Sequence, residues 1–146
     1  MSLTPTVYGL FLQSCLEGRV NMLEDELWAM LVSGYVFNQH THKFKSAITN
    51  ELVGSGYGPG GQKVTTSPSV YNSTTKILNV PAGNLVWPTA TWVNATGAVL
   101  YMNPSGFPDD AKPLVAYVDF GGPQSVTDQA FYLNWAASGA LKLAVP

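Results

Sequence analysis

A glycine-rich stretch, Gly54–Val64, is the first candidate for chemistry, because GSGYGPGGQKV contains the spacing G-x-G-x-x-G. That spacing binds a dinucleotide pyrophosphate when a strand precedes it and a helix follows it. The residues that follow, 62–80, are rich in Thr, Ser and Val and lack a helical repeat, so they predict strands and turns. The Gly-Lys-Ser/Thr of a phosphate loop does not occur after Gly61 either. We therefore expect an ordered structural loop, with some glycines at positive φ, built from Gly54, Gly56, Gly58, Gly60 and Gly61.

The two histidines, His40 and His42, are candidate metal ligands because they lie two residues apart. On an extended segment both would face the same side, and three copies around a threefold axis could present six imidazoles to one ion. Neither cysteine nor carboxylate lies near them at ligand spacing. The favoured interpretation is a loop in which His42 bonds to backbone, without metal or cofactor.

Nucleophiles and acid–base pairs are the remaining candidates for catalysis. Cys15 is the only cysteine, and helical spacing with its apolar neighbours predicts a small buried side chain rather than a nucleophile. Asp109 and Asp110 form the only adjacent aspartate pair, and their Pro-Asp-Asp-Ala context is typical of a solvated turn. The G-x-S-x-G elbow of hydrolases is missing. An enzyme is not expected.

Composition limits the classes of partner. The chain has 146 residues, 46% of them apolar and 11% charged, with a net charge of −2. This predicts one domain, 1–146, with neither the basic face that binds nucleic acid nor a patch that binds anionic membranes. With no secretory signal or membrane-spanning run, we expect synthesis in the cytoplasm. Few charges favour a surface covered by other subunits.

The N-terminal part, 1–20, predicts an arm followed by a helix. Pro5 suits a first helical turn, Gly18 can end the helix, and Val7, Leu10 and Phe11 share one stripe with Ser14 and Cys15. Residues Met1–Thr6 would then be free to extend as an arm.

The region 21–62 is expected to connect this part to the strands, and its segment NMLEDELWAMLVSGYVF has two interpretations. Asn21 and Glu24 form a capping box before leucines at helical spacing, which slightly favours a helix. The apolar run Glu26–Val32, ended by Ser33 and Gly34, is equally typical of a core strand.

The region 63–146 predicts short strands separated by turns. The predicted strands are TKILNV, NLVWPTATWV, GAVLYM, LVAYVDF, AFYLNW and ALKLAV. Turns are predicted at 81–83, 94–97, 103–106, 121–123 and 138–139. Short strands at this spacing predict a mainly β fold, an antiparallel β-sandwich or small barrel with an N-terminal α-helix.

The order of these elements resembles a family of tailed-bacteriophage virion structural proteins. The resemblance rests on LWAMLVSGY, HTHKFKSAITNELVGSGYGPGG, VWPTATW, AKPLVAYVDFGG and ALKLAV, which together span nearly the whole chain. In that family an alternating run stands where ELWAMLVS stands here, so the resemblance favours a strand at Glu26–Val32. It implies a capsid decoration (cement) protein on the outside of the head, with the major capsid protein as partner. The alternative is a neck, tail or fibre component, with possible binding to a host glycan.

Self-association into a homotrimer is expected, because a symmetric plug suits the threefold junctions of an icosahedral shell. The candidate interface residues are Tyr57, Trp87 and Trp92, together with the Met1–Thr6 arm. Trp87 and Trp92 flank Pro88 and, with Tyr57, Tyr71 and Tyr101, could also form a platform for sugar rings. Aromatic residues in strands are more often core or interface residues.

Overall fold

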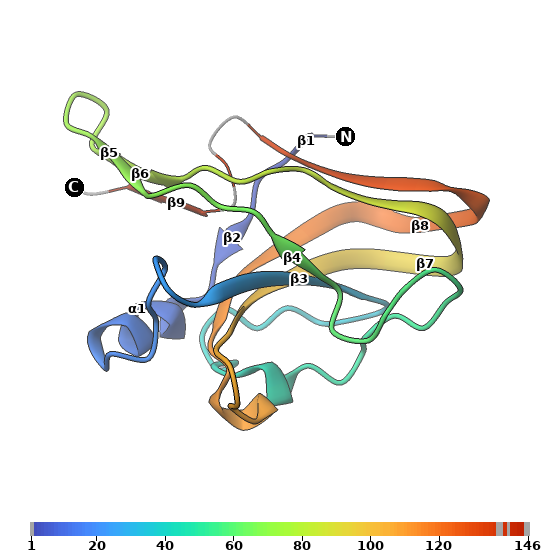
Figure 1. Cartoon of the computed structure of the whole chain (residues 1–146), viewed down its shortest axis with the longest axis horizontal. Coiled ribbons are helices and arrows are strands. Elements are labelled where there is room, and N and C mark those ends of the chain that lie inside the picture. The colour runs from blue at the N-terminus through green and yellow to red at the C-terminus, as the bar shows by residue number, and fades with distance from the viewer. Residues whose placement is uncertain (1, 137–138, 140, 145–146) are drawn as a thin grey trace.

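The computed structural model describes residues 2–136, 139 and 141–144, and it is mainly β (Figure 1). One α-helix and two 3₁₀ turns accompany nine strands in the described part. The elements are β1 (Ser2–Leu3), β2 (Thr6–Val7), α1 (Gly9–Leu16), β3 (Glu26–Val32), η1 (Lys45–Ala47), β4 (Gln62–Val64), β5 (Val70–Asn72), β6 (Ile77–Val80), β7 (Leu85–Asn103), η2 (Asp109–Ala111), β8 (Leu114–Trp135) and β9 (Leu141–Ala144). The larger sheet has the order β1-β8-β7-β3-β4, with β2 also on β8, and the smaller has the order β5-β6-β9. The predicted class, a β-sandwich with a short N-terminal helix, is confirmed.

Strands β7 and β8 form one long antiparallel ribbon that bends back on itself. Figure 1 shows both strands turning at the right-hand end of the view, so that each has a lower and an upper leg. At this bend residues 120–123 of β8 face a single residue of β7, between the pairs Ala95–Gln124 and Gly97–Asp119. Extra residues of this kind bend a strand and increase its twist. The predicted turns at 94–97 and 121–123 are therefore wrong as chain reversals, because these residues form the bend inside continuous strands.

Residues Glu26–Val32 form strand β3, as the resemblance favoured and against the slight preference of the periodicity for a helix. The strand pairs with β7 on one side and β4 on the other, and its last four residues are all buried. The sequence of a strand that is buried on both faces is a continuous apolar run. Such a run has apolar residues at every spacing, so it also contains the helical one. The Asn21 side chain accepts from the backbone N–H groups of Leu23 and Glu24, so the capping signal closes a turn before the strand.

Two expectations for the N-terminal part are wrong. The helix begins at Gly9 rather than near Pro5, and Met1–Thr6 does not supply a free arm: Ser2–Leu3 pairs with β8 in parallel and Thr6–Val7 antiparallel. These backbone bonds hold the chain extended where its local sequence would permit a helix. Gly18 follows the helix at φ +74°, as expected for a stop. Met1 lies outside the described residues.

Cys15 is exposed, which corrects the expectation of a buried side chain. The helix starts later than predicted, and it buries Phe11 and Ser14 while Cys15 faces outward. Partial desolvation raises the pKa of the Cys15 thiol, so the reactive thiolate is disfavoured. In the part of the chain that the structure describes, no helix is both long and apolar enough to cross a membrane.

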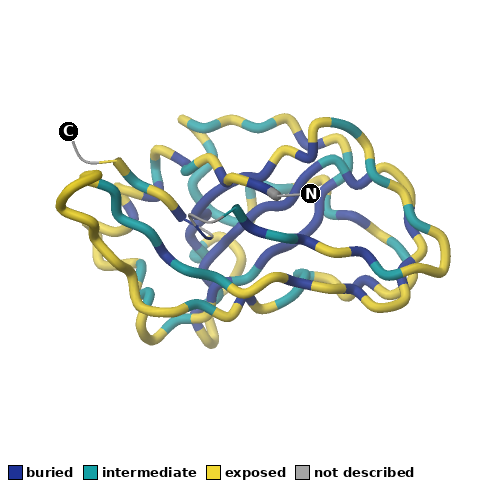
Figure 2. The backbone as a smooth tube through the Cα atoms, turned by 90° about the horizontal axis from the view of Figure 1, so that it is seen from above, coloured by how far each residue is buried: buried dark blue, intermediate teal, exposed yellow. Residues whose placement is uncertain are grey.

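The smaller sheet lies at the upper left in Figure 1 and confirms the predicted strands near 75–80 and 140–145 as β6 and β9. Alternating burial is also confirmed at the end of β8, where Phe131, Leu133 and Trp135 are buried and Tyr132 is exposed. The predicted turn at Ser138–Gly139 falls partly outside the described residues. Viewed from above, buried residues gather in the middle of the molecule, and exposed residues occupy both ends (Figure 2).

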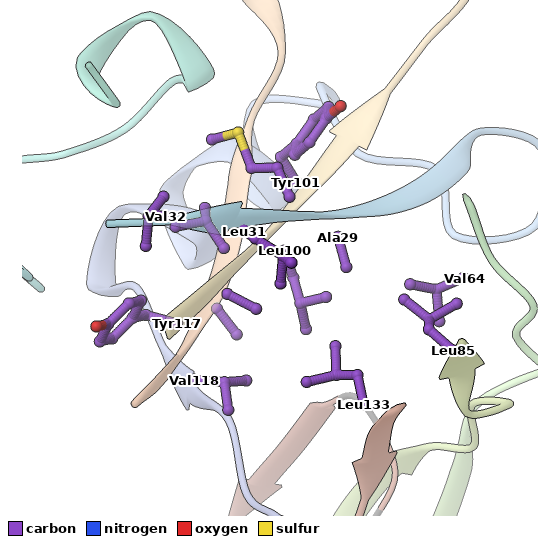
Figure 3. Packing of buried hydrophobic residues seen from close by; sticks show 14 of the residues in the cluster. Ala29, Leu31, Val32, Val64, Leu85, Leu100, Tyr101, Tyr117, Val118 and Leu133 are labelled. Carbon is purple, nitrogen blue, oxygen red and sulfur yellow. The ribbon is translucent and has the colours of Figure 1, made fainter. Parts of the chain in front are cut away.

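One cluster of buried apolar side chains runs from Leu3 to Leu141. Figure 3 shows Ala29 and Leu100 on one side of this interior, with Leu85 and Leu133 on the other. Leu85 and Leu133 are paired on the upper legs of the ribbon, whereas Leu100 pairs with Ala29 on β3. Bending the ribbon therefore closes the core, because it places one half of each strand over the other half.

Candidate functional site

The glycine loop, Gly54–Gly61, lies between the upper leg of β7 and strand β3. Ser55 and Thr91 exchange two backbone hydrogen bonds of 3.0 Å each, which attaches the loop to β7. A Cβ atom on Gly56 would lie 2.1 Å from the Thr89 carbonyl oxygen, and one on Gly61 would lie 1.8 Å from that of Ala29. Both glycines have positive φ, +82° and +84°, so the expected use of positive φ in this loop is confirmed. The loop therefore has a structural role: its glycines let its backbone pack directly against the backbones of β7 and β3.

The Glu51 carboxylate holds this loop in place. Its Oε2 accepts from the Tyr57 hydroxyl at 2.7 Å and from the Gly60 N–H at 2.6 Å. The Tyr57 hydroxyl in turn accepts from the Leu31 N–H at 3.0 Å, and the Tyr101 hydroxyl donates to the Gly60 carbonyl at 2.6 Å. Burial, followed by the bond to Glu51, raises the pKa of Tyr57, and burial raises that of Tyr101. Both phenols therefore stay protonated. Tyr57 donates to Glu51 and accepts from β3, and Tyr101 on β7 donates to the loop.

The three candidate interface residues are inside the molecule, which corrects that prediction. Trp87 is 2% exposed, Trp92 3% and Tyr57 8%. The two indoles meet edge to face with centroids 6.1 Å apart, and the Phe131 ring lies 5.2 Å from Trp92. Trp92 Nε1 has no hydrogen-bond partner among the described residues. These rings fill the space between the two legs of the ribbon and cannot form a surface platform for sugars.

Three side chains form a series of hydrogen bonds that ends at His42. The Tyr8 and Tyr35 hydroxyls lie 2.9 Å apart, and the Tyr35 hydroxyl lies 2.5 Å from His42 Nδ1. His42 thus bonds to a phenol, not to backbone as expected. The other histidine, His40, is exposed, and within the described ranges no group of three or more metal-ligating side chains gathers.

The buried Tyr8 hydroxyl determines which groups donate and which accept in this series of hydrogen bonds. Tyr8 is fully buried, burial raises its pKa, and within the described part Tyr35 is the only partner of its hydroxyl. A buried hydroxyl that keeps its proton must donate it, so Tyr8 donates to Tyr35 and Tyr35 donates to His42. Nδ1 of His42 is then the acceptor, and the ring proton lies on Nε2.

This direction predicts unequal effects of removing the two hydroxyls. Tyr35→Phe leaves the Tyr8 hydroxyl buried without a partner, and we expect it to lower the free energy of unfolding by about 1–3 kcal/mol. Tyr8→Phe leaves Tyr35 still donating to His42, so its cost should be smaller by about 1 kcal/mol. The double variant should cost less than the sum of the two. Urea unfolding measures all three values, and equal, additive costs would contradict the assigned direction.

Charges gather in one half of the molecule. Asp109 bonds to Lys45 at 3.1 Å and to Lys112 at 3.2 Å, and Glu17 bonds to Lys43 at 2.8 Å. Partial burial opposes ionisation of Asp109, but the two lysines outweigh it and lower the pKa of this carboxyl. Asp109 is thus a partner in surface ion pairs, and it lies on η2, the short orange helical turn at the lower end of Figure 1.

The opposite half is nearly free of charge. We call residues 65–93 and 123–136, together with β9, the low-charge half; they form the upper part of Figure 1. Of seven basic and nine acidic residues in the chain, these segments hold only Lys76, Asp128 and Lys142. Their outward side chains include exposed apolar residues: Val70, Tyr71, Val86, Val93 and Tyr132.

Val86 and Tyr132 are direct partners across the upper legs of β7 and β8. Tyr132 is 63% exposed and Val86 40% exposed, so the pair presents an apolar patch on ribbon legs whose only charged residue is Asp128. Sequence reasoning noticed the low overall charge but not its segregation, although the positions of the charged residues along the chain contained that signal. No protein-family model, curated protein or solved structure matches this chain.

Proposed function

We propose that the chain is a structural protein of a tailed-bacteriophage virion, a capsid decoration protein that acts by docking and carries out no reaction. The low-charge half carries this proposal. A surface with few charges and an exposed Val86–Tyr132 pair suits burial against another protein, because desolvating it costs little. The resemblance of the chain to phage virion proteins supplies the identity of the partner, the major capsid protein.

The arrangement of the other polar groups agrees with such a role. Glu51, Tyr57 and Tyr101 hold the glycine loop, and Tyr8, Tyr35 and His42 bond to one another. These groups stabilise the fold, and a rigid fold presents its docking surface without an ordering cost on binding. Self-association adds to retention on the shell, because linked weak contacts act together. The buried aromatic residues cannot supply the threefold contact expected from sequence, so self-association must use another surface.

Capture on phage heads that lack the protein tests this proposal. We expect the wild-type chain to sediment with heads, and Tyr132→Lys to weaken that capture at least about tenfold, because a buried lysine lacks a partner on the apolar patch. Val36→Lys is the matched control: Val36 is 81% exposed outside the low-charge half, so the same added charge should leave capture unchanged.

Other outcomes of this experiment are equally informative. Binding to isolated tails or to glycan-coated beads, and not to heads, would support the neck, tail or fibre alternative instead. Failure to bind any virion component would refute the structural role. Equal losses of capture for Tyr132→Lys and Val36→Lys would refute the assignment of the docking surface.

A further inference from the structure

Strand β5 is an exposed strand at the edge of the smaller sheet. Its three residues, Val70–Asn72, are all exposed, with Val70 at 56% and Tyr71 at 50%. It pairs with β6 on one side, and no described strand pairs with it on the other. Its side chains therefore bury little, although Val and Tyr are residues that gain most from a covered strand.

The backbone of β5 has a free outer row of donors and acceptors. The Asn72 carbonyl accepts from the Lys76 N–H inside the hairpin, so the polar groups of Asn72 point toward β6. Backbone groups alternate along a strand, and those of Tyr71 and Ser69 then point away from β6. Such an edge is a template for another strand, and proteins usually block it with charges. Here the hairpin from 65 to 80 has only one charge, Lys76, at its tip.

We propose that β5 is a self-association edge, on which the β5 strand of a second copy pairs antiparallel about a twofold axis at Val70. Antiparallel pairing of identical strands is self-complementary, so each copy makes the same contact. With the axis at Val70, Ser69 of each copy lies opposite Tyr71 of the other copy. The outward backbone N–H and C=O groups of both residues then find partners in each strand. The two Val70 side chains meet and cover apolar surface that is exposed in the single chain.

A second copy meets no like charge on this edge, so identical β5 strands can pair there. A strand that carries a charge near the axis would face the same charge in its copy, and like charges opposite each other are destabilising. In this register Lys76 lies beyond the paired residues and does not meet its counterpart. The contact joins two three-stranded sheets into one, and it replaces the threefold contact expected from sequence. It does not depend on the virion role.

Introducing a charge of either sign at Val70 tests the contact directly. We expect sedimentation equilibrium to find dimers of the wild-type chain, and Val70→Lys and Val70→Glu each to raise the dissociation constant at least about tenfold, since like charges then face each other. Mixing the two variants should restore dimers, because lysine then faces glutamate across the axis. Val36→Lys and Val36→Glu, which alter an exposed valine outside the hairpin, should dimerise like the wild type.

A wild-type monomer at its highest soluble concentration would overturn the proposal, as would a trimer or a Val70→Lys dimer of unchanged strength. Urea unfolding of the Val70 variants checks that the fold is kept, as expected for an exposed side chain. Capture on heads is measured separately: loss of dimers with capture intact refutes this edge alone, and dimers without capture refute the virion role alone.

Discussion

Gly61→Ala should abolish or nearly abolish the folded state, lowering the free energy of unfolding by more than about 3 kcal/mol. The added Cβ would lie 1.8 Å from the Ala29 carbonyl oxygen, and the contact is with backbone, so no side chain can move aside. The φ angle of +84° adds about 1–2 kcal/mol of strain for any residue with a Cβ. Relief requires separating β4 from β3, which opens one edge of the core. Urea unfolding or the yield of folded protein measures the effect.

Gly58→Ala is the matched control in the same loop. Gly58 is absent from the positions with positive φ, and a Cβ placed there meets nothing within 4 Å. Replacing it should be neutral or stabilise the fold by up to about 1 kcal/mol, because alanine restricts the unfolded chain. If Gly61→Ala unfolds at the same urea concentration as Gly58→Ala, the close approach of loop and strand is not a constraint on this fold.

Trp87→Ala should cost about 3–5 kcal/mol, the range for removing a buried tryptophan. Trp87 is 2% exposed and contacts Tyr57, Trp92 and Phe131 between the legs of the ribbon. Truncation leaves a cavity that neighbouring rings cannot fill without leaving their own positions. We expect a lower urea midpoint and a weaker near-ultraviolet circular dichroism signal.

Trp28→Ala provides the comparison for this substitution. Trp28 lies on β3 and is half-buried, with Nε1 donating to Glu26 at the surface. Its loss should cost about 1 kcal/mol, well below the cost at Trp87. The opposite result, a Trp87→Ala protein that folds normally but no longer associates with itself or with heads, would return Trp87 to the surface role that its sequence context first favoured.

The two halves of the molecule differ in the surface that they expose. Ion pairs at Glu17 and Asp109 lie on the charged half, where exposure to water limits their contribution to stability. The low-charge half leaves Tyr132 and the β5 edge exposed. Substitutions at Tyr132 and Val70 should therefore alter association with little effect on the free energy of unfolding, the reverse of substitutions at Gly61 and Trp87.

Prediction from sequence succeeded where neighbours in the chain decide the outcome. Alternation identified the buried side of Phe131–Trp135, and the glycine-rich segment before Gln62 was recognised as a loop with positive φ angles. It failed where one signal serves two structures. The glycines and proline at 121–123 indicated a turn, but an ongoing ladder with β7 converts the same residues into a bend.

The candidate site illustrates the same limit. Trp87 and Trp92 were predicted at an interface because strand aromatics occur in cores and interfaces alike, and periodicity does not say which side of a bent ribbon is closed. The hydrogen bonds among Tyr8, Tyr35 and His42 join residues from separate segments, and nothing in their spacing indicates that the two hydroxyls and the imidazole meet.

By itself the sequence determined the mainly β class, the low charge, the positive-φ glycine loop and most strand positions, since these depend on side-chain type and on contacts within a few residues. Only the tertiary structure decided that the helix begins at Gly9, that the N-terminal residues join β8, and that the tryptophans lie inside. These outcomes depend on pairing between distant segments. Hydrogen bonds and buried surface gained across such pairs outweigh local preference, and their sum can be evaluated only once the ribbon has bent and closed the core.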